Sequence, residues 1–336
     1  MTTVPRHIQR AGEWTTKRRV VVLLFAIALP LLGWTGQCWS QGKIARIGFL
    51  TPASGGPRTE LVEALRTRGY IEGQTITFEI RAAENHLDRL PELAAELVRS
   101  KVDVIVAVSR PAILAAKHAT RTIPIVMNFW GSEGLVESGI VASFARPGGN
   151  ITGVYMLAAE LDAKRFELLL EALPNARKIA VLNRGNSMPF ARVREAARRA
   201  GIQLHITDPP GPEGYDRVFD AMTKANVDAV LVLSFPRFFY EHQQIIDAAA
   251  KRRIPAMYEW SETARDGGLM AYGPVRAELH GRVATQVDRI LKGANPGDLP
   301  IEQPTKFEFV VNLKTAKALG LTIPESIMVR ADEVIR

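Results

Sequence analysis

Polar, charged and aromatic residues follow the apolar segments of this sequence in two matching sets, and their side chains suit the recognition of a small molecule. Hydroxyl and amide groups supply hydrogen bonds, one arginine and one glutamate supply opposite charges, and aromatic rings supply apolar area. These residues are Thr51, Pro52, Ser109, Arg110, Pro111, Asn128, Trp130, Asn183, Ser234, Phe235, Glu259, Trp260 and Tyr272. Such a mixture is typical of a site that holds a small polar ligand with an apolar or aromatic body.

Two of these residues carry charges that would select a ligand. Ser109, Arg110 and Pro111 stand at the start of a predicted helix, where free backbone N–H groups and the positive end of the dipole can hold a carboxylate. Arg110 could add a bidentate contact to the same carboxylate, or it could point into solvent. Glu259 could meet an ammonium group.

Other members of the set also have a purely structural interpretation. Ser109 and Ser234 could simply cap the helices that follow them. Trp130 and Trp260 could pack on the surface of a lobe, and Tyr272 with the glycine after it could form a hinge turn. The matching positions in the two sets favour a functional role for the group more than for any single member.

The sequence offers little for bond-making chemistry. It has no glycine-rich phosphate loop and no zinc-protease or serine-hydrolase motif, and we find no nucleophile with a base and an orienting group. The six histidines are scattered without metal-ligand spacing, and Cys38 is the single cysteine, which excludes a disulfide framework. We therefore expect a protein that is not an enzyme and needs neither a metal nor a cofactor.

An internal duplication explains why the residues come in two sets. Residues 101–111 reappear as residues 226–236, residues 121–128 as 252–259, and residues 46–51 as 178–183. Two similar halves in one chain of 336 residues predict two lobes, each with its own core. Matching strand ends of the two lobes would then face one cleft.

The alternation of apolar runs and amphipathic segments predicts an α/β fold with parallel, doubly wound sheets. The predicted strands are 44–50, 75–80, 102–108, 125–128 and 151–155 in the first half, and 178–182, 203–206, 228–233, 256–258 and 269–272 in the second, with a later strand at 307–312. The predicted helices include 59–68, 88–100, 111–118, 161–173, 190–200, 215–225, 238–251, 276–291 and 313–319.

These elements divide into two discontinuous lobes. Residues 42–156 with about 274–302 would form lobe 1, and residues 157–273 with about 303–336 would form lobe 2. The chain would cross between the lobes near residues 156, 273 and 303, and several crossings make a hinge that opens and closes as a unit.

The first forty residues have the pattern of a secretory signal peptide. Lys17, Arg18 and Arg19 precede thirteen mostly apolar residues, 20–32, and small and polar residues follow. We expect cleavage after Ser40 and a location in the periplasm; an N-terminal membrane anchor is the alternative. The segment carries five of the basic residues and one acid, so its removal lowers the net charge from +8 to +4. With no basic run that contains aromatics, we expect no nucleic-acid binding.

Three motifs of the sequence resemble one known family. They are residues 147–153 (Pro-Gly-Gly-Asn-Ile-Thr-Gly), Glu259-Trp260 together with residues 267–273, and residues 307–324. The chain is similar there, and over residues 44–336, to the ABC-transporter substrate-binding family related to the tryptophan-binding TrpX proteins. Three cleft positions differ from the usual family pattern, at Arg110, at Phe235 and at Ser132 with Glu133, and the acidic partner of an amino group is displaced.

The resemblance implies a type 1 periplasmic-binding-protein fold, with two Rossmann-like lobes and ligand capture by hinge closure. It implies a solute-binding component of an ABC importer, with an inner-membrane permease and an ATPase as partners, and an amino acid or an aromatic or carboxylated compound as ligand. We expect a monomer. The alternatives are a ligand-sensing regulator of the same fold, which normally has an N-terminal DNA-binding motif, and a secreted enzyme.

Overall fold

The computed structural model describes most of the chain. Described are residue 1 and residues 43–129, 134–156, 158–183, 191–209, 211 and 214–336. The predicted signal peptide, its alternative as a membrane anchor and the predicted site residue Trp130 lie outside these residues. Residues 44–336 form one unit of contacts, and in the part of the chain that is described no helix has the length and apolarity needed to cross a membrane.

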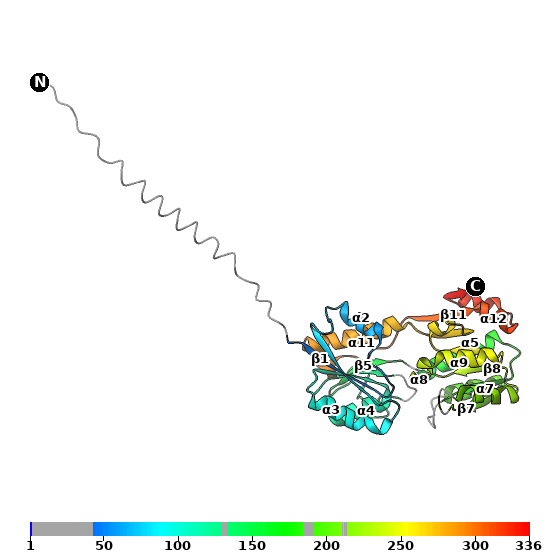
Figure 1. Ribbon diagram of the computed structural model, residues 1–336, viewed down its shortest axis with the longest axis horizontal. Helices are drawn as coiled ribbons and strands as arrows, with labels where there is room; N and C mark the ends of the chain where they lie inside the picture. The colour runs from blue at the N-terminus through cyan, green and yellow to red at the C-terminus, as the bar shows by residue number, and fades with distance from the viewer. Residues whose placement is uncertain (2–42, 130–133, 157, 184–190, 210, 212–213) are drawn as a thin grey trace. The chain divides into compact units, whose positions relative to one another are not determined.

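A five-stranded parallel sheet forms the centre of the first lobe (Figure 1). The strand order is β2-β1-β3-β4-β5, and every neighbouring pair is parallel. The strands are β1 (Ala45–Thr51), β2 (Ile76–Ala82), β3 (Val104–Val108), β4 (Ile125–Phe129) and β5 (Ile151–Tyr155). The order reverses between β1 and β3, and such a switch point is where ligands bind in open α/β sheets.

Helices cover both faces of this sheet. They are α2 (Thr59–Arg66), α3 (Leu90–Arg99) after the short η1 (Leu87–Arg89), α4 (Ser109–Ala119) and α11 (Arg276–Leu291). In Figure 1, α3 and α4 lie on one side and α2 and α11 on the other. Ile105 and Ala107 of β3 pack toward the first pair, whereas Val104 and Val106 pack toward the second. The apolar run of β3 therefore supplies both layers, because successive strand residues point to opposite faces.

The helix α11 returns to the first lobe from late in the sequence. It packs against α2, and the Tyr70 hydroxyl hydrogen-bonds the Asp288 carboxylate with 3.0 Å between the oxygens. The Arg68 guanidinium donates to the Thr285 hydroxyl at 2.7 Å. The short η3 (Pro296–Asp298) that follows α11 lies against β5.

A seven-stranded sheet forms the centre of the second lobe, in the order β12-β11-β10-β9-β8-β6-β7. All of its neighbouring strands are parallel except β10 and β11, which are antiparallel. The strands are β6 (Lys178–Leu182), β7 (Gln203–Thr207), β8 (Ala229–Val232), β9 (Ala256–Tyr258), β10 (Met270–Pro274), β11 (Phe307–Asn312) and β12 (Glu333–Ile335).

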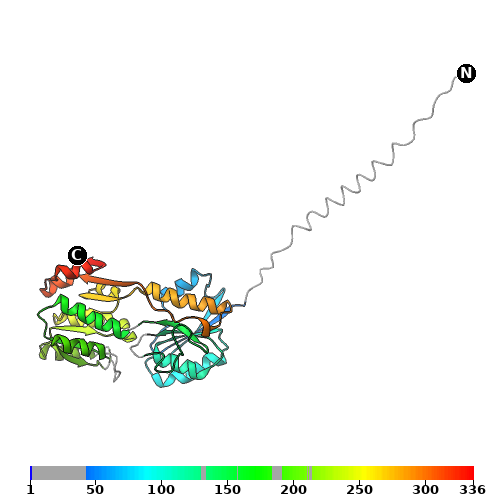
Figure 2. The same ribbon diagram turned by 180° about the vertical axis from the view of Figure 1, so that it is seen from behind.

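The second sheet is also covered on both faces. Its helices are α5 (Ala158–Ala172), α6 (Ala191–Ala200), α7 (Tyr215–Lys224), α8 (Pro236–Tyr240), α9 (His242–Lys251), α10 (Ser261–Arg265), α12 (Leu313–Leu319) and α13 (Glu325–Arg330). Phe166 and Val193 belong to the core beneath α5 and α6, and Phe219 and Ile245 to the core beneath α7 and α9. The C-terminal α13 packs on α5, and Figure 2 shows this end of the chain (red) beside α5 (green).

The prediction of two doubly wound α/β lobes is confirmed, and some details of the elements differ. The sheet of the second lobe continues beyond Tyr272 through β11 and β12. The helix predicted over residues 238–251 is two helices, α8 and α9, which meet at Glu241. Glu241 is held there by side-chain bonds from Arg237 and Tyr215, a tertiary constraint that overrides the helical pattern of the segment.

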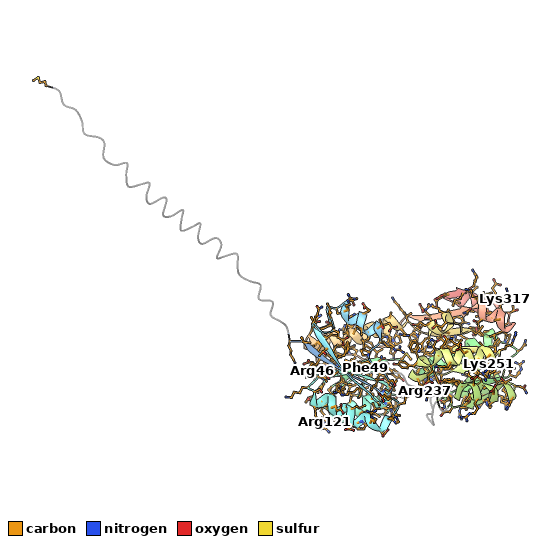
Figure 3. All side chains as sticks on the ribbon, viewed as in Figure 1. Arg46, Phe49, Arg121, Arg237, Lys251 and Lys317 are labelled. Carbon is orange, nitrogen blue, oxygen red and sulfur yellow. The ribbon has the colours of Figure 1, made fainter. Side chains whose placement is uncertain are left out.

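Several exposed cationic side chains lie on both lobes. Phe49 is buried inside the first lobe, whereas Arg121, Lys251 and Lys317 lie at the periphery of the two lobes (Figure 3). Arg46 is partly exposed and pairs with Glu79 at 2.8 Å. The basic residues labelled in the figure are thus dispersed rather than gathered in one patch.

Candidate functional site

The polar residues predicted from the duplication stand at the carboxyl ends of parallel strands, and they are buried. Those of the first lobe are Thr51 after β1, Ser109 after β3 and Asn128 near the end of β4; those of the second are Asn183 after β6, Ser234 beyond β8 and Glu259 after β9. Buried polar groups are rare unless something satisfies them. Their gathering at these strand ends marks the candidate site.

Other predicted site residues are less buried. Pro52 and Arg110 are partly buried and Pro111 is exposed. Phe235 is partly buried, with its ring edge-to-face on Phe238 at 5.7 Å between centroids. Tyr272 lies in β10, with its ring stacked on Phe307 of β11 at 6.1 Å.

A charged pair that the sequence analysis did not single out lies at the centre of the second-lobe site. Arg165 and Asp162 on α5 are essentially unexposed, and the guanidinium is 2.5 Å from the Asp162 carboxylate. The same guanidinium donates to the Ser234 hydroxyl and, at 2.9 Å, to the Tyr272 carbonyl oxygen. Ser234 in turn donates its backbone N–H and its hydroxyl to Asp162 at 3.3 and 3.2 Å.

The helix α5 places this pair because it packs across the ends of β8, β9 and β10. Its buried face contains Leu161, Phe166 and Leu168 as well as Asp162 and Arg165. Residues three apart are neighbours on a helix, so the two charges pair on the face that the strands cover. Two charged residues on the apolar side of an amphipathic helix are the signal that could have revealed them from sequence.

Glu259 lies in the same environment and has no matching cation of its own. Its side chain is 5% exposed, and its Oε1 atom makes no hydrogen bond to any described residue. Burial raises the pKa of Glu259 to about 7. The Asp162 charge adds to the rise, whereas the Arg165 charge and hydrogen bonds from Ser234 and Trp260 oppose it. Burial also raises the pKa of Asp162, and the contacts from Arg165 and Ser234 oppose it.

The backbone of Glu259 is held by a close approach of two strands. A Cβ atom on Gly273 would lie 2.1 Å from the Glu259 carbonyl oxygen, so only glycine fits there. Gly153 has the corresponding role in the first lobe, where a Cβ would lie 2.1 Å from the Met127 carbonyl oxygen. Both glycines belong to motifs that the sequence analysis quoted.

Ser109 adopts an unusual backbone conformation at the start of α4. Its φ angle is 70°, in the left-handed region that non-glycine residues rarely adopt, and it is 8% exposed. The Ser109 hydroxyl is buried without a hydrogen bond to the described residues, and α4 begins with no side-chain cap. The capping interpretation is therefore wrong for Ser109.

The capping interpretation is also wrong for Ser234. The following helix α8 begins after Phe235 without a side-chain cap. The Ser234 hydroxyl instead joins Arg165 to Asp162. Both predicted serines thus have buried hydroxyls at strand ends. The Ser109 hydroxyl is available to a ligand, whereas the Ser234 hydroxyl already bonds Arg165 and Asp162.

Aromatic and cationic side chains connect the lobes near these strand ends. Arg58, before α2, stacks on Phe239 and Tyr240 of α8, with its guanidinium carbon 4.3 and 4.2 Å from the ring centroids. The Arg276 guanidinium, at the start of α11, lies 4.3 Å from the Phe239 centroid. Trp260 is 2% exposed and belongs to an apolar cluster formed mostly by first-lobe residues. Trp260 thus packs between lobes rather than on a lobe surface.

The two parallel-sheet lobes, linked by several passages of the chain, define a type 1 periplasmic-binding-protein fold. The chain belongs to the family described as ABC transporter substrate binding protein, which matches residues 51–335. It is therefore a substrate-binding protein of that transporter family.

The chain is also similar to proteins whose function or structure is known. The chain is 24% identical to a tyrosine-binding protein of Clostridioides difficile over 264 residues, 77% of this chain and 75% of the relative. A conserved domain protein from Vibrio cholerae has a TM-score of 0.76 and 25% identity, covering 87% of this chain and 100% of that one. An ABC domain in complex with L-Trp from Streptococcus pneumonia has a TM-score of 0.74 and 24% identity, covering 87% and 99%.

Proposed function

We propose that this protein captures an aromatic amino acid between its two lobes and delivers it to the permease of an ABC importer. The observation that carries this proposal is the buried group of Asp162, Arg165 and Glu259, which contains two carboxylates and one guanidinium. A ligand that brings a positive charge would balance it.

The ammonium of the ligand is assigned to Glu259. An ionised carboxylate that is buried without a partner is costly, and an opposite charge within hydrogen-bond distance removes most of that cost. The Glu259 Oε1 atom makes no hydrogen bond to a described residue, whereas Asp162 is already paired with Arg165. Glu259 is therefore the carboxylate left for a ligand.

The carboxylate of the ligand is assigned to Ser109 and the start of α4. Backbone N–H groups at the N-terminus of this eleven-residue helix have no intrahelical acceptor, and the left-handed turn at Ser109 is of the kind that forms anion-binding concavities. The Ser109 hydroxyl, buried without a bond to the described residues, supplies a further donor.

An aromatic body is favoured by the relatives and by the surroundings. One relative binds tyrosine and one solved structure holds L-Trp. Phe239 and Tyr272 pack against the apolar cluster that contains Trp260, and aromatic rings offer large apolar area at fixed geometry.

Titration calorimetry with L-tryptophan, L-tyrosine and L-phenylalanine tests the ligand class. Two analogues of tryptophan separate its ends: indole-3-propionate lacks the ammonium and tryptamine lacks the carboxylate. We expect at least one amino acid to bind and to raise the melting temperature, and both analogues to bind at least about tenfold more weakly. Equal binding of indole-3-propionate would contradict the role of Glu259.

The variant Glu259→Gln keeps the shape of the side chain and removes its charge. We expect it to weaken amino-acid binding about tenfold or more and to leave indole-3-propionate binding unchanged. Glu333→Gln, a change to a partly exposed carboxylate paired with Arg265, is the matched control and should bind like the parent. Equal losses in both variants would show a general rather than a site effect.

We further propose that the protein works in the periplasm as a monomer after removal of residues 1–40. The argument is the pattern of the N-terminal sequence and the family to which the chain belongs. Cell fractionation and N-terminal sequencing of the exported chain test the location and the cleavage after Ser40. Loss of labelled amino-acid uptake in a deletion strain tests the transport role. Unprocessed protein in the cytoplasm would contradict both the periplasmic location and the transport role.

A further inference from the structure

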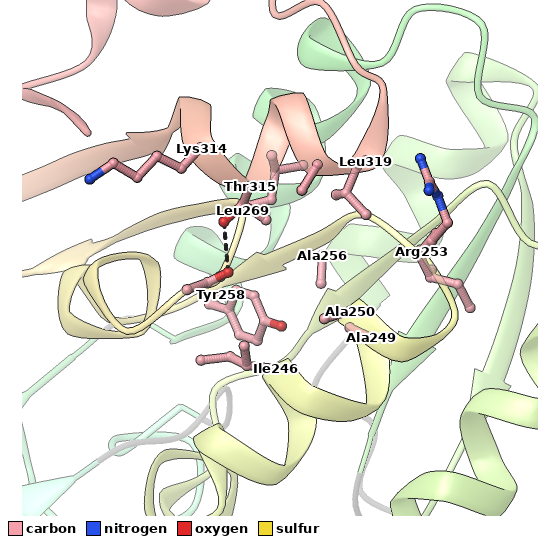
Figure 4. A pocket seen from close by; sticks show the side chains of 14 residues that line it. Ile246, Ala249, Ala250, Arg253, Ala256, Tyr258, Leu269, Lys314, Thr315 and Leu319 are labelled. Carbon is pink, nitrogen blue, oxygen red and sulfur yellow. Dashed lines mark hydrogen bonds between the residues drawn. The ribbon is translucent and has the colours of Figure 1, made fainter. Parts of the chain in front are cut away.

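A pocket of about 280 Å³ opens on the second lobe, away from the residues assigned to the amino acid. It is bounded by α9, by α12 and by the segment that leads into β10 (Figure 4). Its walls combine small residues with larger apolar side chains; the small ones are Ala249, Ala250, Ala256, Gly267, Gly268 and Ala318, and the larger ones are Ile246, Ile254, Leu269 and Leu319. An apolar cavity of roughly 150 Å³ is enough to hold benzene, so this one has room for a ring and a short chain.

Tyr258 supplies a polar group to this cavity that the protein itself does not use. The Tyr258 side chain is 3% exposed and lines the cavity, and its hydroxyl makes no hydrogen bond to any described residue. The ring is fixed because it lies against Gly268, where a Cβ would be 2.8 Å from its Cε2 atom. The hydroxyl is not enclosed by the protein, so an acceptor on a ligand in the cavity could take its hydrogen bond in place of water.

The charge at the cavity is positive. Arg253 and Lys314 line it, and among the described residues no carboxylate does. Within the described chain Arg253 forms no ion pair. Figure 4 shows the Tyr258 hydroxyl directed toward Ala249 and Ala250, the side on which Arg253 stands, whereas Lys314 extends away at the other end.

The Tyr258 hydroxyl remains a hydrogen-bond donor at physiological pH. Burial raises its pKa above the usual range for tyrosine, and the charge of Asp247 on α9 adds to this. Asp247 itself accepts a hydrogen bond from Gln243 at 2.9 Å and is not part of the lining. The Tyr258 hydroxyl and the Arg253 guanidinium lie on the same side of the cavity. Together they could bind an anionic oxygen group at one end of a ligand whose apolar part occupies the cavity.

We propose that this cavity is a second ligand site, which takes a small monocarboxylate with an apolar ring or chain. The apolar body lies among the alanines and glycines, and the carboxylate accepts from Tyr258 and pairs with Arg253. The site is independent of the amino-acid site, since none of its lining residues is among the strand-end residues of that site.

Binding of 3-(4-fluorophenyl)propionate, followed by fluorine NMR and calorimetry, tests the second site in the exported chain. We expect saturable binding, and at least about tenfold weaker binding of the neutral 3-(4-fluorophenyl)propanol because it cannot pair with Arg253. Binding should persist in Glu259→Gln and in the presence of saturating amino acid. Loss of binding under either condition would place the probe in the amino-acid site and overturn the proposal.

Three variants locate the probe. Ala318→Leu fills the cavity from an exposed helix position and should abolish binding, whereas Ala221→Leu, an exposed position on α7, should not. Tyr258→Phe and Arg253→Gln should each weaken binding about tenfold, and Lys317→Gln, an exposed charge of α12 outside the lining, should leave it unchanged. Melting temperatures show whether each variant is folded.

The proposal is overturned by either of two results. One is the absence of saturable binding to the parent protein. The other is unchanged binding to a folded Ala318→Leu variant, because a filled cavity cannot hold the ring. Neither result bears on the amino-acid site, whose own test uses different ligands and the Glu259→Gln variant.

Discussion

At the scale of single residues, the folded protein favours the protonated form of Glu259 at pH values where a glutamate in water is ionised. It is buried at the end of β9, and its pKa is raised to about 7, whereas an exposed glutamate ionises near 4.5. Between these two values the folded protein binds a proton that the unfolded chain releases. The free energy of unfolding therefore falls as the pH rises through this window.

Replacing Glu259 by glutamine should remove this pH dependence. The ionised carboxylate costs the ligand-free protein about 3 kcal/mol at pH 8 relative to pH 4.5, from 1.36 kcal/mol for each pKa unit. We expect Glu259→Gln to be more stable than the parent at pH 8 and similar to it near pH 5. Urea unfolding at both pH values measures this, and Glu333→Gln should show no such gain at pH 8.

The same group links ligand binding to protons. An ammonium ligand favours the ionised carboxylate, so its affinity should increase as the pH rises from 6 to 8 and level off above the pKa of Glu259. Calorimetry in buffers of different ionisation enthalpy should detect release of a proton at pH 7. An affinity that does not change with pH would mean that the ligand cation does not meet Glu259.

At the scale of elements, the junction of β3 and α4 combines strain with an unused hydroxyl. Ser109 has a φ angle of 70° and no side-chain cap follows it. The left-handed conformation costs a residue with a Cβ about 1–2 kcal/mol. Such a cost is retained where the surroundings impose it, often at a binding site.

Two changes at Ser109 separate strain from capping. Ser109→Gly should stabilise the protein by about 1 kcal/mol, since glycine tolerates this φ angle. Ser109→Ala should change stability by less than about 0.5 kcal/mol, because the hydroxyl makes no bond to the described residues. Thermal unfolding measures both effects.

The control for the two Ser109 variants is the helix α12, whose first turn has a side-chain cap. The Asn312 side chain accepts from the Thr315 N–H at the start of α12, and Asn312→Ala should cost about 1 kcal/mol or more. A loss of this size in Ser109→Ala would contradict the absence of a cap at α4. Ligand affinity should fall in Ser109→Ala if the hydroxyl holds the carboxylate.

At the scale of the whole molecule, aromatic and cationic side chains of the two lobes contact one another. Arg58 of the first lobe stacks on Phe239 and Tyr240 of the second. Arg276, at the start of α11, pairs at 3.5 Å with Glu262 of α10 in the second lobe. These contacts exist only while the lobes are together, so they contribute to closure and not to the folding of either lobe.

Replacing Arg58 by alanine should shift the protein toward separated lobes. Loss of two cation–π contacts corresponds to roughly a tenfold change in the closed fraction. Spin labels at cysteines replacing Arg121 and Lys317, both exposed, would report the change as longer distances without ligand. Arg66→Ala, an exposed change on the helix α2 that follows Arg58, should leave the distances unchanged. Unchanged distances in Arg58→Ala would contradict its role in closure.

A buried histidine under α2 gives the whole molecule a second, opposite pH response. His280 is 3% exposed, and burial lowers its pKa to about 4 while its Nδ1–H donates to the Arg276 carbonyl oxygen at 3.0 Å. Glu60 raises this pKa, and Arg276 and Arg58 lower it. The unfolded chain takes up the proton first, so stability is full above pH 6.5 and is lost as the pH falls toward 4.

Replacing His280 by glutamine should abolish the loss of stability between pH 6.5 and 4, which amounts to about 3 kcal/mol. In the parent protein this loss opposes the gain from Glu259 over nearly the same range. Between pH 6.5 and 4.5 we therefore expect His280→Gln to gain stability on acidification relative to the parent, and Glu259→Gln to lose stability relative to it. Urea unfolding series of the three proteins would test this, and parallel slopes would contradict it.

Much of the fold could be predicted because its signals are local and repeated. The strands β3 and β8 are apolar runs with matching flanks, and the duplication of these segments indicates two lobes. The residues that follow such strands, including Ser109, Ser234 and Glu259, must reach the carboxyl edge of a parallel sheet whatever the details of packing. The strand at residues 307–312 was predicted, but its place in the second sheet and the strand β12 were not, because the antiparallel pairing of β10 with β11 is set by a long-range return of the chain.

The sequence by itself determined two doubly wound lobes and the set of polar residues at their strand ends. Strand periodicity and duplication can be recognised from residues that are close together in the sequence. Only the tertiary structure decided that the pKa of Glu259 is raised, that the backbone of Ser109 is strained and that the Ser109 hydroxyl makes no hydrogen bond to the described residues. Arg165 meets Ser234 and Tyr272 across long stretches of chain, and the pKa of Glu259 follows from that burial. Burial and electrostatics are properties of contacts between distant segments, so they appear only when the chain is folded.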